Sequence, residues 1–228
     1  MSTGKLEQRA ANDDREMKQP TKDIWPSPTV FVVDDDAAVL KSLSRLLRAA
    51  RLAVATFDSP REFLDRYDSN APGCLVLDVA MPGLNGLELQ QTLIARGYEV
   101  AIIFLTGHGD IPMTVKAIRH GAVDFLTKPV DDDDLLKAVH AAIEKDRLQR
   151  QAHAEVAEIQ QQLAALTPRE REVLEHVIAG RLNKQIAADL GTVEKTIKVH
   201  RARVMEKMQV HSVAELVRLA GRVGFAGK

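Results

Sequence analysis

The stretch that decides the fold is Cys74-Leu75-Val76-Leu77-Asp78-Val79-Ala80-Met81-Pro82-Gly83, a short apolar run that ends in a carboxylate and a Pro-Gly turn. Continuous apolar runs of this length are typical of strands that are buried on both faces of a parallel sheet. Cys74 lies inside the run, so we interpret it as a core residue rather than a reactive thiol. Asp78 is then expected at the carboxyl end of a buried strand.

Four further apolar runs alternate with amphipathic stretches around this strand. The runs lie at 29–33, 53–57, 101–105 and 123–126, and stretches of helical periodicity follow the five runs at 37–50, 60–67, 87–95, 111–120 and 132–147. Ser59-Pro60-Arg61-Glu62 adds a capping box with proline at the first helical position. Five such units predict an α/β domain with a doubly wound, five-stranded parallel sheet covered by helices on both faces.

The pattern becomes purely helical from Thr167 onward. Thr167-Pro168-Arg169-Glu170 is a second capping box, Gly180 and Gly191 are expected to end two helices, and Ser212 starts a fourth. A helix at 183–190, a glycine, and a helix at about 193–208 capped by Thr192 have the spacing of a helix-turn-helix. We therefore predict a second, smaller all-α domain.

These patterns give the domain organisation. We expect a flexible tail at 1–28, the α/β domain at 29–146, a helical linker at 147–165 and the all-α domain at 166–228. The tail has no apolar segment of a secretory signal, and no stretch has the roughly 20 apolar residues of a membrane span. With one cysteine in 228 residues, this indicates a cytoplasmic protein without a membrane partner.

The two predicted domains differ in charge. Residues 28–166 carry 14 Lys and Arg against 20 Asp and Glu, whereas residues 167–228 carry 12 against seven. A basic domain joined to an acidic one suggests different partners, with nucleic acid a candidate for the basic part. Ordinary surface variation would explain the same difference, so charge alone does not decide.

Polar side chains cluster where the predicted strands end. Ligands bind outside the carboxyl ends of parallel strands, so residues far apart in sequence are expected to share one crevice: Asp34, Asp35, Asp36, Asp78, Thr106 and Lys128. Oxygen ligands without His or Cys favour a hard ion, above all Mg²⁺. A carboxylate beside such an ion is suited to attack a phosphoryl group, with Lys128 and Thr106 contacting its oxygens. The alternative is that Asp35 and Asp36 only cap a helix and Lys128 is a surface lysine.

The second helix of the helix-turn-helix has two distinct faces. Its core stripe is expected at Val193, Ile197, Val204 and Met208. Lys195, Lys198 and Val199 lie on the opposite face, which is also the pattern of a merely solvated surface. An apolar Val199 among lysines instead suits a recognition helix, where it contacts a thymine methyl. Phosphate contacts are expected from Asn183, Lys184, Thr192 and Lys207.

Residues 29–146 resemble the receiver domain of two-component response regulators. The resemblance rests on Val33-Asp34-Asp35-Asp36, Leu77-Asp78 through Gly86, Leu105-Thr106-Gly107-His108-Gly109 and Phe125-Leu126-Thr127-Lys128-Pro129. It implies strand order 2-1-3-4-5, Asp78 as phosphoacceptor, and a cis Lys128-Pro129 bond. It also implies Mg²⁺ held by Asp35, Asp78 and the backbone carbonyl of Ala80, with Asp34 acting largely through water and Asp36 capping the helix.

The same resemblance implies a conformational switch. The Thr106 hydroxyl moves toward the phosphoryl group, and the ring of Phe125 fills the space it leaves. The face at about 110–127 would then dimerise or release the C-terminal domain. Ala80 departs from the family, where a larger polar side chain is common, and this leaves the rate of dephosphorylation open.

Residues 166–220 resemble the LuxR/NarL type of DNA-binding domain. The matching segments are Leu166 through Leu174, Asn183-Lys184-Gln185-Ile186-Ala187 and Thr196-Ile197-Lys198-Val199-His200-Arg201. The family carries its base contacts on the recognition helix, which implies Lys195, Lys198, Val199, Arg201 and Arg203. Arg201 lies nearest the core side of that helix. Three segments of the chain, at 106–110, 121–125 and 200–205, are most similar to the FixJ subgroup.

The resemblance implies a transcription regulator, usually an activator, rather than an enzyme. Its partners would be a sensor histidine kinase, promoter DNA, a second copy of the chain on phosphorylation, and RNA polymerase. One alternative is a DNA-binding regulator that works without phosphorylation, against which the intact Asp34, Asp35, Asp78, Thr106 and Lys128 argue. Another is a phosphatase on a similar sheet, but the Asp-x-Asp-x-Thr of haloacid-dehalogenase-type phosphatases is missing after Asp34. Relatives serve nitrogen fixation, nodulation and aromatic catabolism, and the sequence does not choose among these.

Overall fold

The computed structural model describes residues 25, 27–107, 115 and 117–225. The chain divides between Arg147 and Leu148 into two compact units, each described below by itself. No helix in the described part is both long and apolar enough to cross a membrane.

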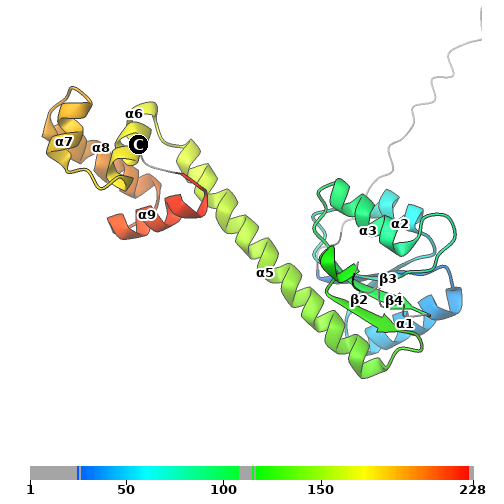
Figure 1. Ribbon diagram of the computed structural model, residues 1–228. Helices are drawn as coiled ribbons and strands as arrows, with labels where there is room; N and C mark the ends of the chain where they lie inside the picture. Colours follow the sequence, from blue (N-terminus) through cyan, green and yellow to red (C-terminus); the bar gives the residue numbers. More distant parts are fainter. Residues whose placement is uncertain (1–24, 26, 108–114, 116, 226–228) are drawn as a thin grey trace, which may run out of the picture. The chain divides into compact units, whose positions relative to one another are not determined.

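The N-terminal unit contains a five-stranded, all-parallel sheet in the order β2-β1-β3-β4-β5 (Figure 1). Both the sheet and its strand order confirm the prediction. The strands are β1 Thr29–Val33, β2 Ala53–Phe57, β3 Gly73–Asp78, β4 Ala101–Thr106 and β5 Asp124–Thr127. The helices are α1 Ala37–Ala49, α2 Pro60–Arg66, α3 Gly86–Ala95 and α5 Asp132–Ala164.

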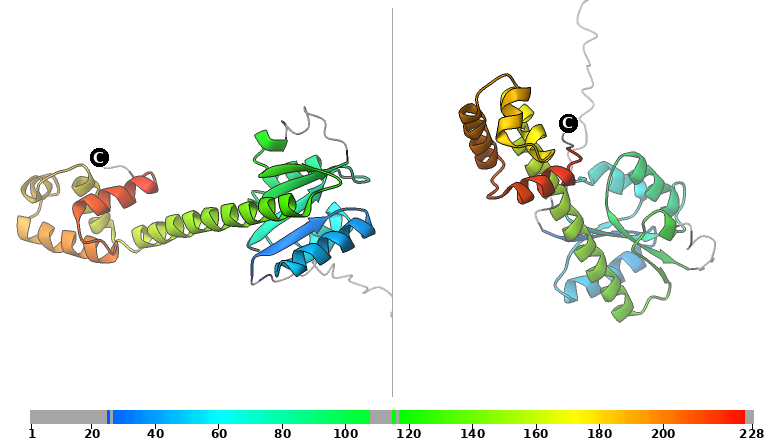
Figure 2. Two further views of the ribbon diagram at one scale, coloured as in Figure 1. Left: turned by 90° about the horizontal axis from the view of Figure 1, so that it is seen from below. Right: turned by 60° about the vertical axis from the view of Figure 1, so that its left-hand side comes forward.

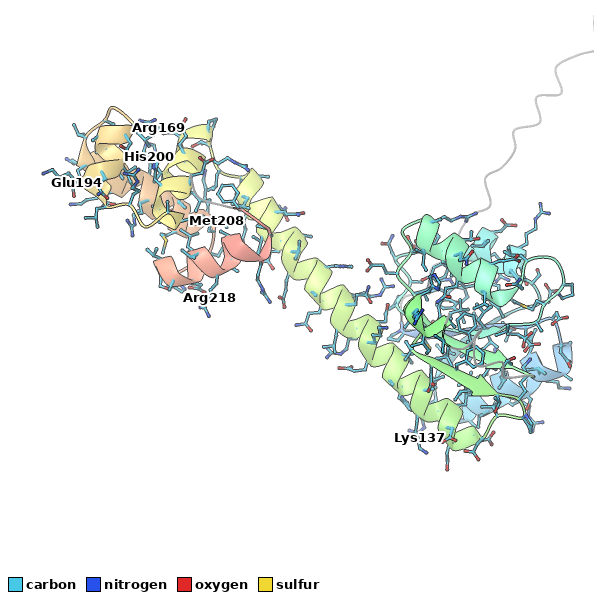
Figure 3. The ribbon with its side chains drawn as sticks, viewed as in Figure 1. Lys137, Arg169, Glu194, His200, Met208 and Arg218 are labelled. Carbon is cyan, nitrogen blue, oxygen red and sulfur yellow. The ribbon has the colours of Figure 1, made fainter. Side chains whose placement is uncertain are left out.

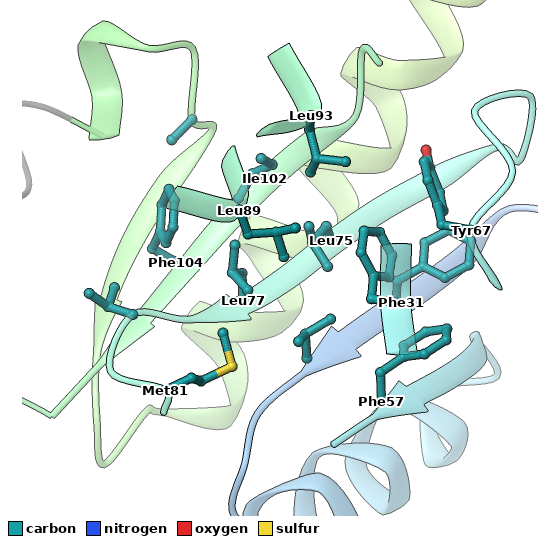
Figure 4. Packing of buried hydrophobic residues seen from close by; sticks show 14 of the residues in the cluster. Phe31, Phe57, Tyr67, Leu75, Leu77, Met81, Leu89, Leu93, Ile102 and Phe104 are labelled. Carbon is teal, nitrogen blue, oxygen red and sulfur yellow. The ribbon is translucent and has the colours of Figure 1, made fainter. Parts of the chain in front are cut away.

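Helices cover both faces of the sheet, as Figures 1 and 2 show. Successive residues of β1 point to opposite faces, and Phe31 and Val32 belong to separate buried clusters. On one face, Phe31, Phe57, Leu75 and Leu77 pack with residues of α2 and α3, and Figure 4 shows this cluster. On the other face, Val30, Val32, Cys74 and Val76 pack with residues of α1 and the first turns of α5. Both faces of the sheet are therefore packed against helices, and this packing positions the strand ends.

Local signals explain where several helices begin. Ser59 accepts a hydrogen bond from the Glu62 amide, with Pro60 as the first residue of α2. Asn85 and Glu88 form a capping box at α3. Gly86 lies where a Cβ atom would be 2.3 Å from the Asp78 carbonyl oxygen, so only glycine lets α3 start directly beside the end of β3.

Three predictions for this unit have different outcomes. Trp25 was placed in a flexible tail, but its ring packs edge-on against Phe31 with centroids 5.4 Å apart, so the ordered core begins before residue 28. The helix predicted at 111–120 lies largely outside the described residues, of which 115 and 117–119 are helical. The last helix runs on through the predicted helical linker and ends at Ala164, so the helical character expected of that linker is confirmed.

The C-terminal unit is all-α, as predicted. After the end of α5 it contains α6 Pro168–Ile178, α7 Asn183–Asp189, α8 Glu194–Lys207 and α9 Val213–Arg222. Ile159 and Leu163 of α5 are buried with residues of α6 to α9, so the second half of the predicted linker belongs to the core of this unit. Gly180 and Gly191 have positive φ and end α6 and α7 as expected.

The start of α8 differs from the prediction. The N-cap is Val193 rather than Thr192, and it makes no side-chain capping hydrogen bond. Val193 was also expected in the core stripe, but its side chain is 64% exposed, whereas Ile197, Val204 and Met208 are fully buried. The error has a simple reason: Val193 precedes the helix, so a helical wheel does not give its direction.

Candidate functional site

The carboxylates predicted at the strand ends lie together. Asp34 directly follows β1 and Asp78 ends β3, and these two strands are paired with Val33 opposite Leu77. Oxygen atoms of Asp34, Asp35 and Asp78 all lie within 4.8 Å of one another. Asp34 and Asp78 are buried and Asp35 is exposed. The neighbouring parallel strands thus bring three acidic groups to one end of the sheet.

Lys128 joins the two buried carboxylates. Its Nζ atom lies 2.6 Å from Asp34 Oδ2 and 2.7 Å from Asp78 Oδ1. The peptide bond from Lys128 to Pro129 is cis, and the Lys128 amide donates to the Thr106 carbonyl oxygen at 2.7 Å. Because the ammonium contacts both acids, the alternative that Lys128 is an ordinary surface lysine does not describe this residue.

The electrostatics of the site follow from burial and from this ion pair. Burial raises the pKa of the Asp78 carboxyl, and the opposing effect of the Lys128 ammonium does not cancel the shift. Burial also acts to lower the pKa of Lys128, but its hydrogen bonds to Asp34 and Asp78 outweigh this and raise it. In the described part of the chain, one ammonium, that of Lys128, contacts this cluster of three acidic groups, so acidic groups outnumber basic ones there.

Asp36 has a different role from its neighbours. Its Oδ1 atom accepts hydrogen bonds from the amides of Ala38, at 2.7 Å, and Val39, at 3.4 Å, and so caps α1. The Asp36 amide donates to Asp34 Oδ1 at 2.9 Å, which holds the Asp34 carboxylate in place. The capping of the first helix thus falls to Asp36, which leaves Asp35 available to the acidic cluster.

The donor set fits a hard divalent cation. It consists of carboxylate oxygens from Asp34, Asp35 and Asp78, two of them buried, without a nitrogen or sulfur ligand among them. The backbone amide of Ala80 donates a hydrogen bond to the Asp78 carboxylate, so the main chain after β3 runs beside the acids. An ion of this type would relieve the mutual repulsion of the three carboxylates.

Thr106 and Phe125 lie on the neighbouring strands β4 and β5. Thr106 ends β4 and is buried, and it is opposite Thr127 in the pairing of the two strands. Phe125 is half-buried, with its ring 6.0 Å from that of Phe104. Much of the face predicted at 110–127 lies outside the described residues.

Gln90 is a residue that the sequence did not single out. It is buried in α3, and its side-chain amide donates to the carbonyl oxygens of Ala117 and His120, both at 3.3 Å. These carbonyls belong to the segment between β4 and β5, which includes part of the predicted switch face. Its partners lie 27 and 30 residues away, so no local pattern could have identified it.

The exposed surface of α8 carries most of the predicted base-contacting residues. Lys195, Lys198 and Arg203 are exposed, and Val199 is 46% exposed. Lys198 also forms an exposed ion pair with Glu194 at 3.3 Å. Lys184 is exposed at the start of α7, and Thr192 is half-buried before α8. These groups lie on the second helix of the helix-turn-helix and on the elements that precede it.

Three other residues that were predicted to contact DNA form hydrogen bonds or ion pairs within the C-terminal unit. Arg201 Nη1 donates to Asn183 Oδ1 at 3.0 Å and so links α8 to α7. Lys207 Nζ lies 2.7 Å from Glu170 Oε2 and donates to the Ala165 carbonyl oxygen. Glu170 is buried, and Lys207 lowers its pKa to about 2. Lys207 therefore holds α8 against the start of α6, and its contact with a DNA phosphate stays a prediction.

Comparison with known proteins identifies the family to which this chain belongs. Residues 30–140 match the response regulator receiver domain, and residues 164–220 match the bacterial regulatory proteins of the luxR family. The chain is 47% identical over 197 residues to nodulation protein W of Bradyrhizobium diazoefficiens, covering 86% of this chain and 87% of that protein. The chain belongs to the response regulators of two-component systems. This response regulator is a DNA-binding protein with a receiver domain and a luxR-type helix-turn-helix.

Other relatives are similar to this chain over most of their length. The response regulator is 46% identical over 194 residues to the response regulator protein TodT of Pseudomonas putida, covering 85% of this chain and 86% of TodT. It is 45% identical over 195 residues to the transcriptional regulatory protein FixJ of B. diazoefficiens, covering 86% of this chain and 95% of FixJ. Among solved structures, the response regulator StyR has a TM-score of 0.80 at 46% identity, covering 86% of this chain and 98% of StyR.

Proposed function

We propose that Asp78 of this response regulator accepts a phosphoryl group from a sensor histidine kinase, and that the modification promotes dimerisation and promoter binding. The observation that carries the proposal is the bridge from Lys128 Nζ to both Asp34 and Asp78, at 2.6 and 2.7 Å. It places a fixed cation at the carboxylate that would be phosphorylated. Asp34, Asp35 and Asp78, with the Ala80 carbonyl, would hold Mg²⁺.

The residues of the site support phosphoryl transfer in a direct way. An oxygen of Asp78 forms a bond to phosphorus while the bond from phosphorus to the donor breaks, and the donor leaves with the electron pair. Lys128 then contacts the new phosphoryl oxygens as a point charge. The Thr106 hydroxyl donates a hydrogen bond to the same group. When bound, Mg²⁺ neutralises negative charge on the carboxylates and on the incoming phosphoryl group.

Phosphorylation of Asp78 would shift the receiver from one conformational state to another. Movement of Thr106 toward the phosphoryl group and of the Phe125 ring into the vacated space would change the surface around β5. That surface would form the homodimer. The dimer would bind promoter DNA through Lys195, Lys198, Val199 and Arg203, with Lys184 and Thr192 on phosphates. We further propose that it activates transcription through RNA polymerase in the cytoplasm, and that it has no enzymatic turnover beyond slow self-dephosphorylation.

The test is phosphorylation by acetyl phosphate and Mg²⁺, followed by intact mass and by DNA binding to a selected promoter fragment. We expect one added phosphoryl group, a dimer, and tighter DNA binding. Asp78→Asn should abolish all three. Asp36→Asn is the matched control, because asparagine caps α1 as well as aspartate does and the acidic cluster is kept. Equal DNA binding with and without phosphorylation would support a regulator that works independently of phosphorylation.

A further inference from the structure

Val193 is an exposed apolar residue at a position that normally favours a polar one. It is the N-cap of α8, its side chain is 64% exposed, and it makes no capping hydrogen bond. Valine is among the poorest residues at an N-cap, because it has no side-chain oxygen to accept from the first amides of the helix. Neither burial nor capping therefore explains a valine here.

Other helices of the chain follow the usual rule. The N-caps of α1, α2, α3, α6 and α9 each accept a hydrogen bond from the first turn; they are Asp36, Ser59, Asn85, Thr167 and Ser212. Among these and the two helices of the helix-turn-helix, only α7 and α8 have apolar N-caps, Leu182 and Val193, and both are exposed. The exceptions thus coincide with the DNA-binding motif.

The position of Val193 relative to α8 indicates what it contacts. In a helix-turn-helix the N-terminal residues of the recognition helix contact base edges in the major groove. Val193 stands directly before Glu194, the first residue of α8, which Figure 3 labels at one end of the helix with Met208 marking the other. The exposed Lys195, Lys198 and Val199 follow in the first turns of the same helix.

We propose that Val193 is a specificity-determining residue that contacts the C5-methyl group of a thymine in the operator. The inference rests on the proposed function of α8 as the recognition helix, and it adds a residue at the start of that helix. The thymine methyl is the apolar group that base pairs present in the major groove, so it suits an exposed valine at the start of a helix that carries the exposed Lys195 and Lys198. The lysines nearby favour DNA over an apolar protein partner.

The experiment starts from operator duplexes enriched from random DNA by the phosphorylated wild-type protein. Each thymine of the operator is then replaced singly by deoxyuridine, which removes only the methyl group. At the thymine that Val193 contacts in each half-site, which differs from the thymine expected at Val199, we expect wild-type affinity to fall about fourfold, the factor for one buried methyl group. Val193→Ser should bind the unmodified operator more weakly and show no further loss on that replacement.

Val193→Ser is chosen because it supplies a capping hydroxyl, so its thermal midpoint should equal or exceed that of the wild type. A loss of thymine dependence then cannot be attributed to unfolding. Val217→Ser is the matched control, since Val217 is an exposed valine on α9 and should leave the thymine dependence unchanged. The same deoxyuridine penalties in wild type and Val193→Ser would overturn the contact. A wild-type protein that enriches no sequence would contradict the proposed function itself.

Discussion

At the scale of single residues, charge compensation by Lys128 dominates the receiver site. Replacing Lys128 with alanine leaves Asp34 and Asp78 buried and close together without the ammonium that contacts both. We expect the free energy of unfolding without Mg²⁺ to fall by about 1–3 kcal/mol, and phosphorylation to slow by at least about tenfold. Urea unfolding with and without Mg²⁺ checks this: Mg²⁺ should restore more stability to Lys128→Ala than it adds to the wild type. Equal effects of Mg²⁺ on both proteins would be inconsistent with the shared acidic cluster.

Glu170 makes a second prediction at this scale. Lys207 lowers its folded-state pKa from the ordinary value of 4.5 to about 2. A depressed carboxyl pKa contributes stability that is fully present above about pH 4.5 and is lost as the pH falls toward 2. Urea unfolding of the full chain should therefore show that the C-terminal unit loses stability between pH 6 and pH 3. The loss of stability should be smaller in Glu170→Gln. An identical pH dependence in both proteins would show that Glu170 is not the titrating group.

At the scale of elements, Gln90 ties α3 to the segment between β4 and β5. In Gln90→Leu the carbonyls of Ala117 and His120 lose a donor, which we expect to cost about 1–3 kcal/mol of stability. Because that segment includes part of the proposed switch face, the ratio of DNA affinities with and without phosphorylation should also fall. Gln91→Leu is the control, since Gln91 is the exposed neighbour on the same helix. An unchanged ratio in Gln90→Leu would limit this residue to a structural role.

Most helices and strands could be predicted from the sequence, but several contacts between them could not. Strands buried on both faces appear as continuous apolar runs, and helices carry caps and periodicity, so the five strands, the helices between them and the acidic strand ends were predictable. The strand order was predicted only through the resemblance to receiver domains. The roles of Gln90 and Lys207 were not, because their partners lie 27 or more residues away and leave no local pattern. The positions of Trp25 and Val193 were missed for a related reason. Each lies just outside a periodic segment, where periodicity does not give the direction of a side chain.

At the scale of the whole molecule, an acidic receiver domain is joined to a basic DNA-binding domain. DNA affinity should fall linearly on a log–log plot against salt concentration, because basic groups displace counterions from phosphates. Lys184→Ala, which removes a proposed phosphate contact from each copy in the dimer, should reduce the magnitude of that slope by about 1.8. Val199→Ala, which removes a proposed base contact, should weaken binding while keeping the slope. Fluorescence anisotropy at several salt concentrations distinguishes the two, and a changed slope in Val199→Ala would contradict this division of roles.

Acidic groups at the ends of β1 and β3 form one site, and we propose that the group on β3, Asp78, carries the signal. The most direct measurement reduces the phosphorylated protein with borohydride, which converts an aspartyl phosphate into homoserine, and maps the product by peptide mass spectrometry. We predict homoserine at position 78 in place of Asp78, dependent on Mg²⁺ and greatly reduced in Lys128→Ala. Modification at Asp34, at Asp35 or outside the receiver, with Asp78 intact, would contradict the account.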